Sequence, residues 1–262
     1  MGIKIPKNHP RAESLEIREK LVEAFRKGVV APEGLIAHGR GEAFDYILGE
    51  KTIQPANRAI RAAASMLLTA ERPVISVNGN TAALVAKDLV RLANKVEAEI
   101  EVNLFYRTTV REVAIESLLK RAGAKLVLGV AEETSARIPE LGSERRLVDS
   151  RGILVADVVL IPLEDGDRAE ALARMGKKVI AVDLNPLSRT SQKASITIVD
   201  NIVRAMPLLA KKVENLKDYK GKKLETICQE FDNSENLRRC IETIQKGLGK
   251  LTEGCTRAFK SS

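Results

Sequence analysis

Aromatic and sulfur-containing residues are scarce in this chain of 262 residues. It contains no tryptophan, three tyrosines, five phenylalanines, two histidines and three cysteines. The cysteines, Cys228, Cys240 and Cys255, have neither the spacing of a CxxC pair nor that of a zinc finger, and their odd number argues against a disulfide framework. Because His9 and His38 are the only histidines, a histidine-based metal site and a Cys–His nucleophile pair are both disfavoured.

Long apolar runs are also missing. No run approaches the roughly 18–20 residues that a membrane-spanning helix needs. The first 13 residues contain no apolar signal-peptide core, and the Met-Gly start has Pro6 where an N-myristoylation signal has serine or threonine. We therefore expect a cytoplasmic protein that does not associate with membranes.

The charge is positive but dispersed. The chain has a formal net charge of +8, and no segment is a strongly basic block. With so few aromatic side chains, a surface for stacking nucleic-acid bases is poorly supplied. A small polyanionic ligand fits this mild surplus of positive charge at least as well as a nucleic acid does, and we expect no nucleic-acid partner. Abundant Lys, Arg and Glu with little Cys and no Trp suits a thermophilic source.

Strand-like and helix-like segments alternate from residue 73 onward. Continuous apolar, β-branched runs are typical of strands buried on both faces of a parallel sheet, and alternation with amphipathic helices implies a doubly wound α/β fold. The sequence thus predicts a mainly parallel, six-stranded sheet. Its strands are expected at Val74–Val77, Ile100–Leu104, Lys125–Val130, Ala156–Ile161, Val179–Val182 and Ile196–Val199.

Helical segments flank this core on both sides. We expect an N-terminal helical segment (1–72) packed on the core, an α/β core (73–204) and a C-terminal helical segment (205–262), together forming one compact domain. Helical spacing and breakers predict N-terminal helices over 10–28, 42–48 and 55–68, with a loop from Pro32 to Gly41. Residues 131–152 are predicted to form a short helix or an irregular loop.

The residues that follow each strand are the candidates for chemistry, because open α/β sheets bind ligands outside the carboxyl ends of their strands. After the first strand come Asn78, Gly79, Asn80 and Thr81. Free amides at a helix N-terminus attract phosphate, so this turn is a candidate substrate-binding site. The alternative is a tight turn in which Asn80 or Thr81 only caps the helix. The turn matches neither GxGxxG nor the P-loop pattern.

A second polar stretch follows the fifth strand. Asp183 ends that strand, where a carboxylate can accept hydrogen bonds from ribose, although it could instead cap the turn at Asn185. Arg189 and Thr190 lie close enough in sequence to reach phosphate oxygens. Further strand-end candidates are Phe105 to Thr108, Pro162 to Asp167, and Asp200 with Asn201.

Two arginines of the N-terminal segment are further candidates, and each also has an interpretation without a ligand. Arg40 lies between two glycines, which predicts either a loop that approaches a ligand or a flexible surface loop. Arg18, among charged neighbours on the first helix, has the pattern of a solvated position.

Several long strings resemble those of the archaeal 4-phosphopantoate–β-alanine ligases, also called phosphopantothenate synthetases. The resemblance covers essentially the whole chain. The strings are Ile5-Pro6-Lys7-Asn8-His9-Pro10-Arg11, Ala37-His38-Gly39-Arg40-Gly41-Glu42-Ala43-Phe44-Asp45-Tyr46, Ser76-Val77-Asn78-Gly79-Asn80, and Asp183-Leu184-Asn185-Pro186-Leu187-Ser188-Arg189-Thr190.

The resemblance implies a homodimeric enzyme of coenzyme A biosynthesis with a Rossmann-like fold. It would join (R)-4-phosphopantoate to β-alanine, using ATP and Mg²⁺ and releasing AMP and diphosphate through an acyl-adenylate. The ATP contacts that the resemblance implies are Arg18, Arg40, Asp183, Leu184, Asn185, Arg189, Thr190, Asn201 and Ile202. It identifies neither the metal ligands nor the base that accepts a proton from β-alanine.

Three other functions stay open on the sequence alone. A non-catalytic nucleotide-binding regulatory protein would bind ATP without turnover. A nicotinamide-dependent oxidoreductase could share the fold, since such sheets serve many reactions, but the missing GxGxxG pattern disfavours it. An RNA-binding protein would need a more concentrated basic surface.

Overall fold

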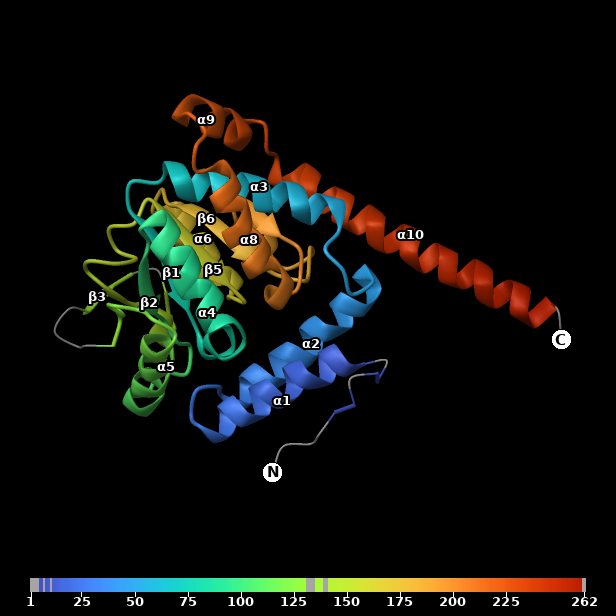
Figure 1. Ribbon diagram of the computed structural model, residues 1–262, viewed down its shortest axis with the longest axis horizontal. Coiled ribbons are helices and arrows are strands. Elements are labelled where there is room, and N and C mark those ends of the chain that lie inside the picture. The colour runs from blue at the N-terminus through green and yellow to red at the C-terminus, as the bar shows by residue number, and fades with distance from the viewer. Residues whose placement is uncertain (1–4, 7, 10, 131–134, 139–140, 261–262) are drawn as a thin grey trace.

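A five-stranded parallel sheet lies at the centre of the structure (Figure 1). The structure is a computed structural model that describes residues 5–260 except 7, 10, 131–134 and 139–140. The strand order is β2-β1-β5-β6-β7, so the chain runs outward from β1 in both directions. The strands are β1 (Pro73–Val77), β2 (Glu99–Val102), β5 (Val158–Pro162), β6 (Lys178–Val182) and β7 (Ile196–Ile198).

The prediction of a sixth strand at Lys125–Val130 is wrong. In the run 125–130, only Leu128 forms a bridge, with Glu101 of β2. Its amide donates to Ile100 O at 2.8 Å, and its carbonyl accepts from the Val102 amide at 2.9 Å. Gly129 then adopts a φ of 75°, in the left-handed region, which ends the extended conformation after a single bridge.

Residues 131–152, expected to form a short helix or irregular loop, contain a small antiparallel pair where the structure describes them. This pair is β3 (Ser135–Arg137) with β4 (Leu147–Asp149), and a 3₁₀ turn, η2 (Glu144–Arg146), precedes β4. Residues 131–134 and Pro139 lie outside the described residues.

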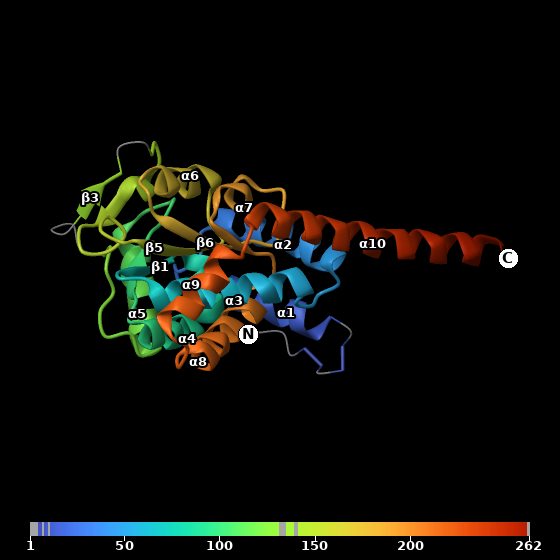
Figure 2. The ribbon, with the colours of Figure 1, turned by 90° about the horizontal axis from the view of Figure 1, so that it is seen from above.

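Helices occupy both faces of the sheet, as Figure 2 shows with α6 and α7 on one side and α3, α4 and α8 on the other. Alternate strand residues face opposite cores. Ile75 and Ile180 pack with α3, α4 and α8, whereas Val74 and Val179 pack with α6 and with the segment from Leu141 to Ala156. The helices are α1 (Ala12–Arg26), α2 (Pro32–Leu48), α3 (Gln54–Thr69), α4 (Gly79–Val96), α5 (Thr109–Arg121), α6 (Gly166–Arg174), α7 (Arg189–Lys193), α8 (Ile202–Leu216), α9 (Gly221–Gln229) and α10 (Asn233–Lys260).

The predicted loop from Pro32 to Gly41 is wrong, because these residues form most of α2. Pro32 lies in the first turn, where its fixed φ favours a helix. The helix ends at Gly49, whose φ of 85° provides a left-handed C-cap. Gly39 and Gly41 therefore lie inside a helix, and Arg40 projects from a helix and not from a flexible loop.

The C-terminal helix α10 extends away from the sheet in both views (Figures 1 and 2). Near its start, Leu237 and Cys240 pack against Leu48, Ile53 and Leu184. Within the described part of the chain, no helix combines the length and the apolar character needed to cross a bilayer.

Glu101 is a buried carboxyl group on β2 that fixes the segment after β4. Its oxygens accept hydrogen bonds from the amides of Asp149 at 3.0 Å and Ile153 at 2.6 Å. Gly152 makes this approach possible, since a Cβ there would lie 2.1 Å from Oε2 of Glu101. Burial raises the pKa of Glu101 to about 7, although the two amides and Arg168 oppose the rise.

This raised pKa predicts that Glu101 makes stability depend on pH. The folded state holds the proton up to about pH 7, whereas the carboxyl group ionises near its ordinary value of 4.5 when unfolded. The stability that Glu101 provides is therefore present below about pH 4.5 and lost as the pH rises through 7. The two pKa values correspond to a change of about 3 kcal/mol.

Glu101→Gln should remove this slope from the free energy of unfolding measured by urea titration between pH 5 and pH 8. Glu99→Gln, at an exposed position of the same strand, is the matched control. Identical slopes for Glu101→Gln and the natural protein would show that Glu101 is not the titrating group.

Candidate active site

A cavity of about 580 Å³ lies at the carboxyl edge of the sheet. Its walls come from the turns after β1, β5, β6 and β7, from the loop after β2, and from α2. It lies where strand order changes direction, at β1 and β5, which is where doubly wound sheets bind ligands. The lining includes most of the predicted binding residues: Arg40, Asn78, Gly79, Asn80, Asp183, Leu184, Asn185, Arg189, Thr190, Asn201 and Ile202.

The N-termini of four helices line this cavity. Gly79, Gly166, Arg189 and Ile202 are the first residues of α4, α6, α7 and α8, and each is in the lining. First-turn amides have no partner within their own helix and carry partial positive charge. The edge is therefore suited to an anionic ligand.

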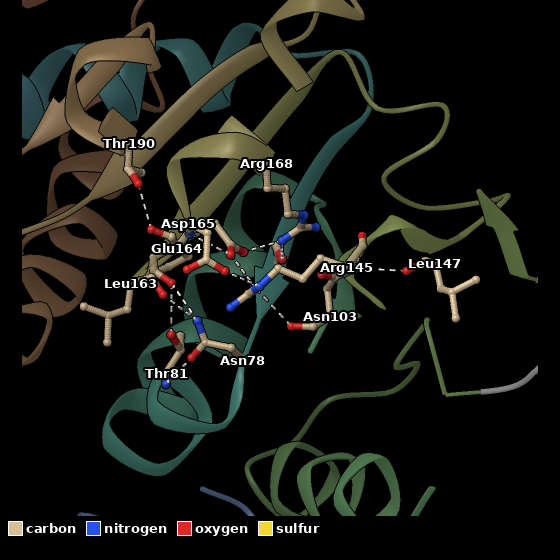
Figure 3. A network of polar contacts seen from close by, with 12 residues as sticks. Asn78, Thr81, Asn103, Arg145, Leu147, Leu163, Glu164, Asp165, Arg168 and Thr190 are labelled. Atoms are coloured by element: carbon tan, nitrogen blue, oxygen red, sulfur yellow. Dashed lines mark hydrogen bonds and ion pairs between the residues drawn. The ribbon is translucent and has the colours of Figure 1, made fainter. Parts of the chain in front are cut away.

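Asn78 joins the turns that follow β1 and β5 (Figure 3). Its Nδ2 donates to the carbonyls of Pro162 at 3.0 Å and Leu163 at 2.9 Å, and its Oδ1 accepts from the Thr81 amide at 3.0 Å. Asn78, not Asn80 or Thr81, is thus the N-cap of α4. Thr81 is buried and bonds to Pro162 O at 3.3 Å, and it does not line the cavity.

A buried ionic network supports the loop after β5 (Figure 3). Glu164 forms ion pairs with both Arg145 and Arg168, and Arg145 Nε lies 2.8 Å from Asp165 Oδ2. The Thr190 hydroxyl donates to the carbonyl of Glu164 at 2.8 Å. Burial raises the pKa of Asp165, and Arg145 opposes this. The charge of Arg145 is therefore compensated within the protein.

The turn after β6 is organised by Asp183. Its Oδ1 accepts from the Asn185 amide at 2.9 Å, and its Oδ2 accepts from the Ser188 hydroxyl. Burial raises the pKa of Asp183, while these hydrogen bonds and the charge of Arg40 oppose the rise. Asp183 thus caps its own turn, as the alternative prediction held, and also lines the cavity.

The helix α2 forms the wall of the cavity that faces the sheet edge. Asn80 Nδ2 donates to the carbonyl of Gly34 at 2.8 Å, which joins α2 to the start of α4. The side chain of Arg40 is exposed and makes no hydrogen bond or ion pair with any described residue. Burial lowers the pKa of His38, which favours a neutral imidazole at the cavity wall.

Comparison with known proteins decides the family. The model of the phosphopantothenate/pantothenate synthetase family matches residues 55–247. The chain belongs to this family. Relatives that carry the name 4-phosphopantoate–β-alanine ligase include a protein of Thermococcus onnurineus, 54% identical over 96% of each chain, and one of Thermococcus kodakarensis, 53% identical over 96% of each chain. A Methanosarcina mazei protein of the same name is 50% identical over 93% of this chain and 95% of its own.

A cluster of charged and polar residues connects α2 to the start of α8 in this member of the synthetase family. Asp45 of α2 accepts hydrogen bonds from Asn201 Nδ2 at 2.8 Å and from Arg204 Nη1 at 3.2 Å. Arg204 Nε also donates to Asp200 Oδ1 at 3.0 Å, and Thr52 donates to Asp200 Oδ2 at 2.6 Å. Asn201 is thereby held at the cavity wall.

Arg18 is a predicted nucleotide contact that lies outside the cavity that the other predicted contacts line. Its Nε and Nη2 donate to Glu42 Oε2 at 3.0 and 2.7 Å, across the α1–α2 interface. A role for Arg18 in nucleotide binding stays a prediction.

The strand-end rule had singled out Phe105, Tyr106 and Glu164, and all three line the cavity. Arg111 and Arg145 also line the cavity, but the strand-end rule did not identify them. Arg111 lies in the first turn of α5, where its sequence pattern is that of a solvated helix residue, and Arg145 lies in a segment predicted to be irregular. No sequence signal separated these two arginines from others.

The contact between Gly34 and Asn80 predicts different outcomes for two glycines of α2. A Cβ at Gly34 would lie 2.3 Å from Asn80 Oδ1, whereas a Cβ at Gly39 would meet nothing within 4 Å. Gly39→Ala should raise the free energy of unfolding by about 0.5–1 kcal/mol. Gly34→Ala should be less stable than Gly39→Ala by about 1 kcal/mol or more, because it disrupts the Asn80 hydrogen bond. Urea titration of both variants measures these changes. Equal stabilisation by both substitutions would contradict the close contact between Gly34 of α2 and Asn80.

Proposed function

We propose that this protein is an ATP-dependent ligase that joins (R)-4-phosphopantoate to β-alanine. The products are 4′-phosphopantothenate, AMP and diphosphate, and the reaction belongs to coenzyme A biosynthesis. The observation that carries the proposal is the cavity at which four helix N-termini converge, in a chain about half identical to relatives with this ligase name. Its volume lies within the range of about 300–1,000 Å³ typical of small-molecule sites.

The nucleotide is assigned to the β6–β7 part of the edge. Asp183 and the turn through Asn185 would contact the nucleoside, while Arg189, Thr190 and Arg40 would reach the phosphates. Leu184, Asn201 and Ile202 complete this part of the wall. We interpret the strand order and the two helix layers as a Rossmann-like, doubly wound fold. Folds of this kind bind nucleotides at the carboxyl edge of the sheet.

The reaction follows from the charges that must meet. A carboxylate oxygen of phosphopantoate attacks the α-phosphorus of ATP, and the bond to the diphosphate leaving group breaks. The amine of β-alanine then attacks the acyl carbon, and AMP leaves with the former carboxylate oxygen. Arg40 and the helix N-termini would stabilise the negative charge that develops at the α-phosphate. The amine must lose a proton, and His38, held neutral at the wall, is suited to accept it.

Mg²⁺ would accompany the nucleotide and neutralise charge on its phosphates. The described residues hold no group of three or more His, Cys, Asp or Glu side chains suited to a metal ion. That composition fits Mg²⁺, which is usually bound through substrate phosphates, waters and one or two carboxylates. Asp165, whose side chain is 44% exposed, is one of the carboxylates of the lining and would contribute through the oxygen that does not pair with Arg145.

We also propose a homodimer in the cytoplasm. The family resemblance supports the homodimer. Equilibrium sedimentation would test the oligomeric state.

The products test the proposed function. Purified protein with ATP, Mg²⁺, 4-phosphopantoate and β-alanine should release AMP and diphosphate in equal amounts with phosphopantothenate. Omitting either organic substrate should stop steady-state release. ADP with orthophosphate would indicate an acyl-phosphate in place of the adenylate. Binding of ATP with no turnover of these substrates would indicate a non-catalytic protein.

Arg40→Ala and Asp183→Asn should impair the enzyme in different ways. Arg40→Ala should raise the barrier in kcat/KM by about 1.5–3 kcal/mol, much of it in kcat, because a charged contact at the phosphates strengthens in the transition state. Its thermal stability should hold within about 0.5 kcal/mol, since the side chain is exposed and unpartnered. Asp183→Asn should mainly raise the KM for ATP and weaken discrimination among nucleotides.

Steady-state kinetics with ATP varied and thermal melts of both variants check these outcomes. Full activity of Arg40→Ala, or a large loss of its stability, would contradict the assignment of Arg40 to the phosphates.

A further inference from the structure

Arg111 is a cationic group of the cavity that forms no ion pair with a described carboxylate. Its Nη2 donates to the carbonyl of Val29 at 3.2 Å, and its Nη1 donates to the carbonyl of Tyr106. Both acceptors are neutral, and Glu33, the carboxylate whose charge raises the pKa of Arg111 against the effect of burial, lies beyond ion-pair distance. Its Nε is buried and makes no hydrogen bond with a described residue. Because its hydrogen-bond acceptors are neutral, the Arg111 guanidinium keeps a positive charge and unused N–H donors that a ligand can bind.

The other arginines of the cavity differ from Arg111 in this respect. Arg145 pairs with Glu164 and Asp165, and Arg189 pairs with Glu170. Among the arginines described in the lining, only Arg40, on α2, likewise forms no ion pair, although its charge acts on the pKa of Asp183. The cavity thus has two open cationic positions.

Arg111 lies against the start of α4. A Cβ built at Gly79 would lie 3.0 Å from Arg111 Nη2, so the guanidinium is adjacent to the first residue of this 18-residue helix. The Thr81 amide is taken by Asn78, while the amides of Gly79 and Asn80 precede the first helical hydrogen bond. A guanidinium fork beside first-turn amides is an arrangement that binds phosphate.

This cationic position is separated from the nucleotide by one strand. β5 lies between β1, which leads into α4, and β6, which ends at Asp183. Adjacent strands lie about 4.8 Å apart, so the two strand ends are about 10 Å apart. That spacing leaves room for a short carbon chain whose carboxylate faces the nucleotide and whose other end carries a second anion.

We infer that Arg111, together with the first-turn amides of α4, binds the phosphate group of 4-phosphopantoate and selects the phosphorylated substrate over free pantoate. The inference rests on the proposed function and assigns one end of its substrate. Phe105 and Tyr106, with ring centroids 5.0 Å apart, line the same end and provide apolar surface for the substrate's methyl groups. Without the phosphate, the charge of Arg111 is left unpaired, which penalises pantoate.

Substrate discrimination by Arg111 variants tests the inference. Arg111→Met should lower kcat/KM for 4-phosphopantoate by about 10- to 100-fold, the effect of losing a charged hydrogen-bonded partner. The same variant should change kcat/KM for pantoate less than about 3-fold, so the preference for the phosphorylated substrate falls. The KM for ATP should stay within about 2-fold, and Arg111→Lys should recover part of the preference.

Arg121→Met is the matched control, because Arg121 is an exposed arginine on the same helix and does not line the cavity. It should leave both substrates unaffected. Equal losses with phosphopantoate and pantoate, or no loss with either, would overturn the inference.

Calorimetric titration separates this inference from the proposed function. Natural protein should bind 4-phosphopantoate without ATP, and Arg111→Met should bind it about 10-fold or more weakly. Failure of the natural protein to make phosphopantothenate, with Arg111-dependent binding retained, would reject the ligase and keep the phosphate site. Equal binding by the natural protein and Arg111→Met would reject the phosphate site and leave the ligase standing. The circular dichroism spectrum of Arg111→Met at the assay temperature should match that of the natural protein, which shows that the variant is folded.

Discussion

Parallel strand pairing is the constraint on which the rest of this structure depends. When all strands of the sheet run in one direction, every strand ends at the same edge and each crossover helix that follows directly starts there. In this chain the starts of α4, α6, α7 and α8 are therefore gathered around one cavity. The partial positive charge of four helix N-termini favours anions before any side chain contributes.

The cluster of Asp45, Asn201, Arg204 and Asp200 completes the site by holding α2 across this edge. Asp45 is 5% exposed and Asp200 is 1% exposed, so removing Arg204 would leave two buried carboxylates without their cation. The same contacts position Asn201, one of the residues assigned to the nucleotide. The stability of the α2 wall and the geometry of the site thus depend on the same contacts.

Charge compensation separates the arginines that shape the cavity from those open to ligands. Arg145 and Arg168 share Glu164 and support the loop after β5. Arg40 of α2 and Arg111 of α5 form no ion pair with a described carboxylate. Two anionic groups can therefore be bound at separate positions, as a reaction between a nucleotide and a phosphorylated acid requires.

The strands could be predicted from the sequence because burial on both faces gives a continuous apolar run. The run over 125–130 is also mostly apolar but fails to form a strand, because it contains Gly129, which adopts a left-handed conformation. The glycines around Arg40 indicated a loop, but Pro32 at the N-terminus and the packing of Gly34 on Asn80 favour a helix. Strand ends located most of the site, whereas Arg111 depends on helix orientation and on which carboxylates lie nearby, neither of which is local in sequence.

The central claim is that the carboxylate of phosphopantoate attacks the α-phosphate of ATP in this cavity. Isotope transfer tests it most directly: phosphopantoate labelled with ¹⁸O in its carboxylate is turned over with ATP and β-alanine, and the products are examined by mass spectrometry. The account predicts one ¹⁸O atom in AMP and none in diphosphate. Label in orthophosphate, or AMP without label, would contradict it.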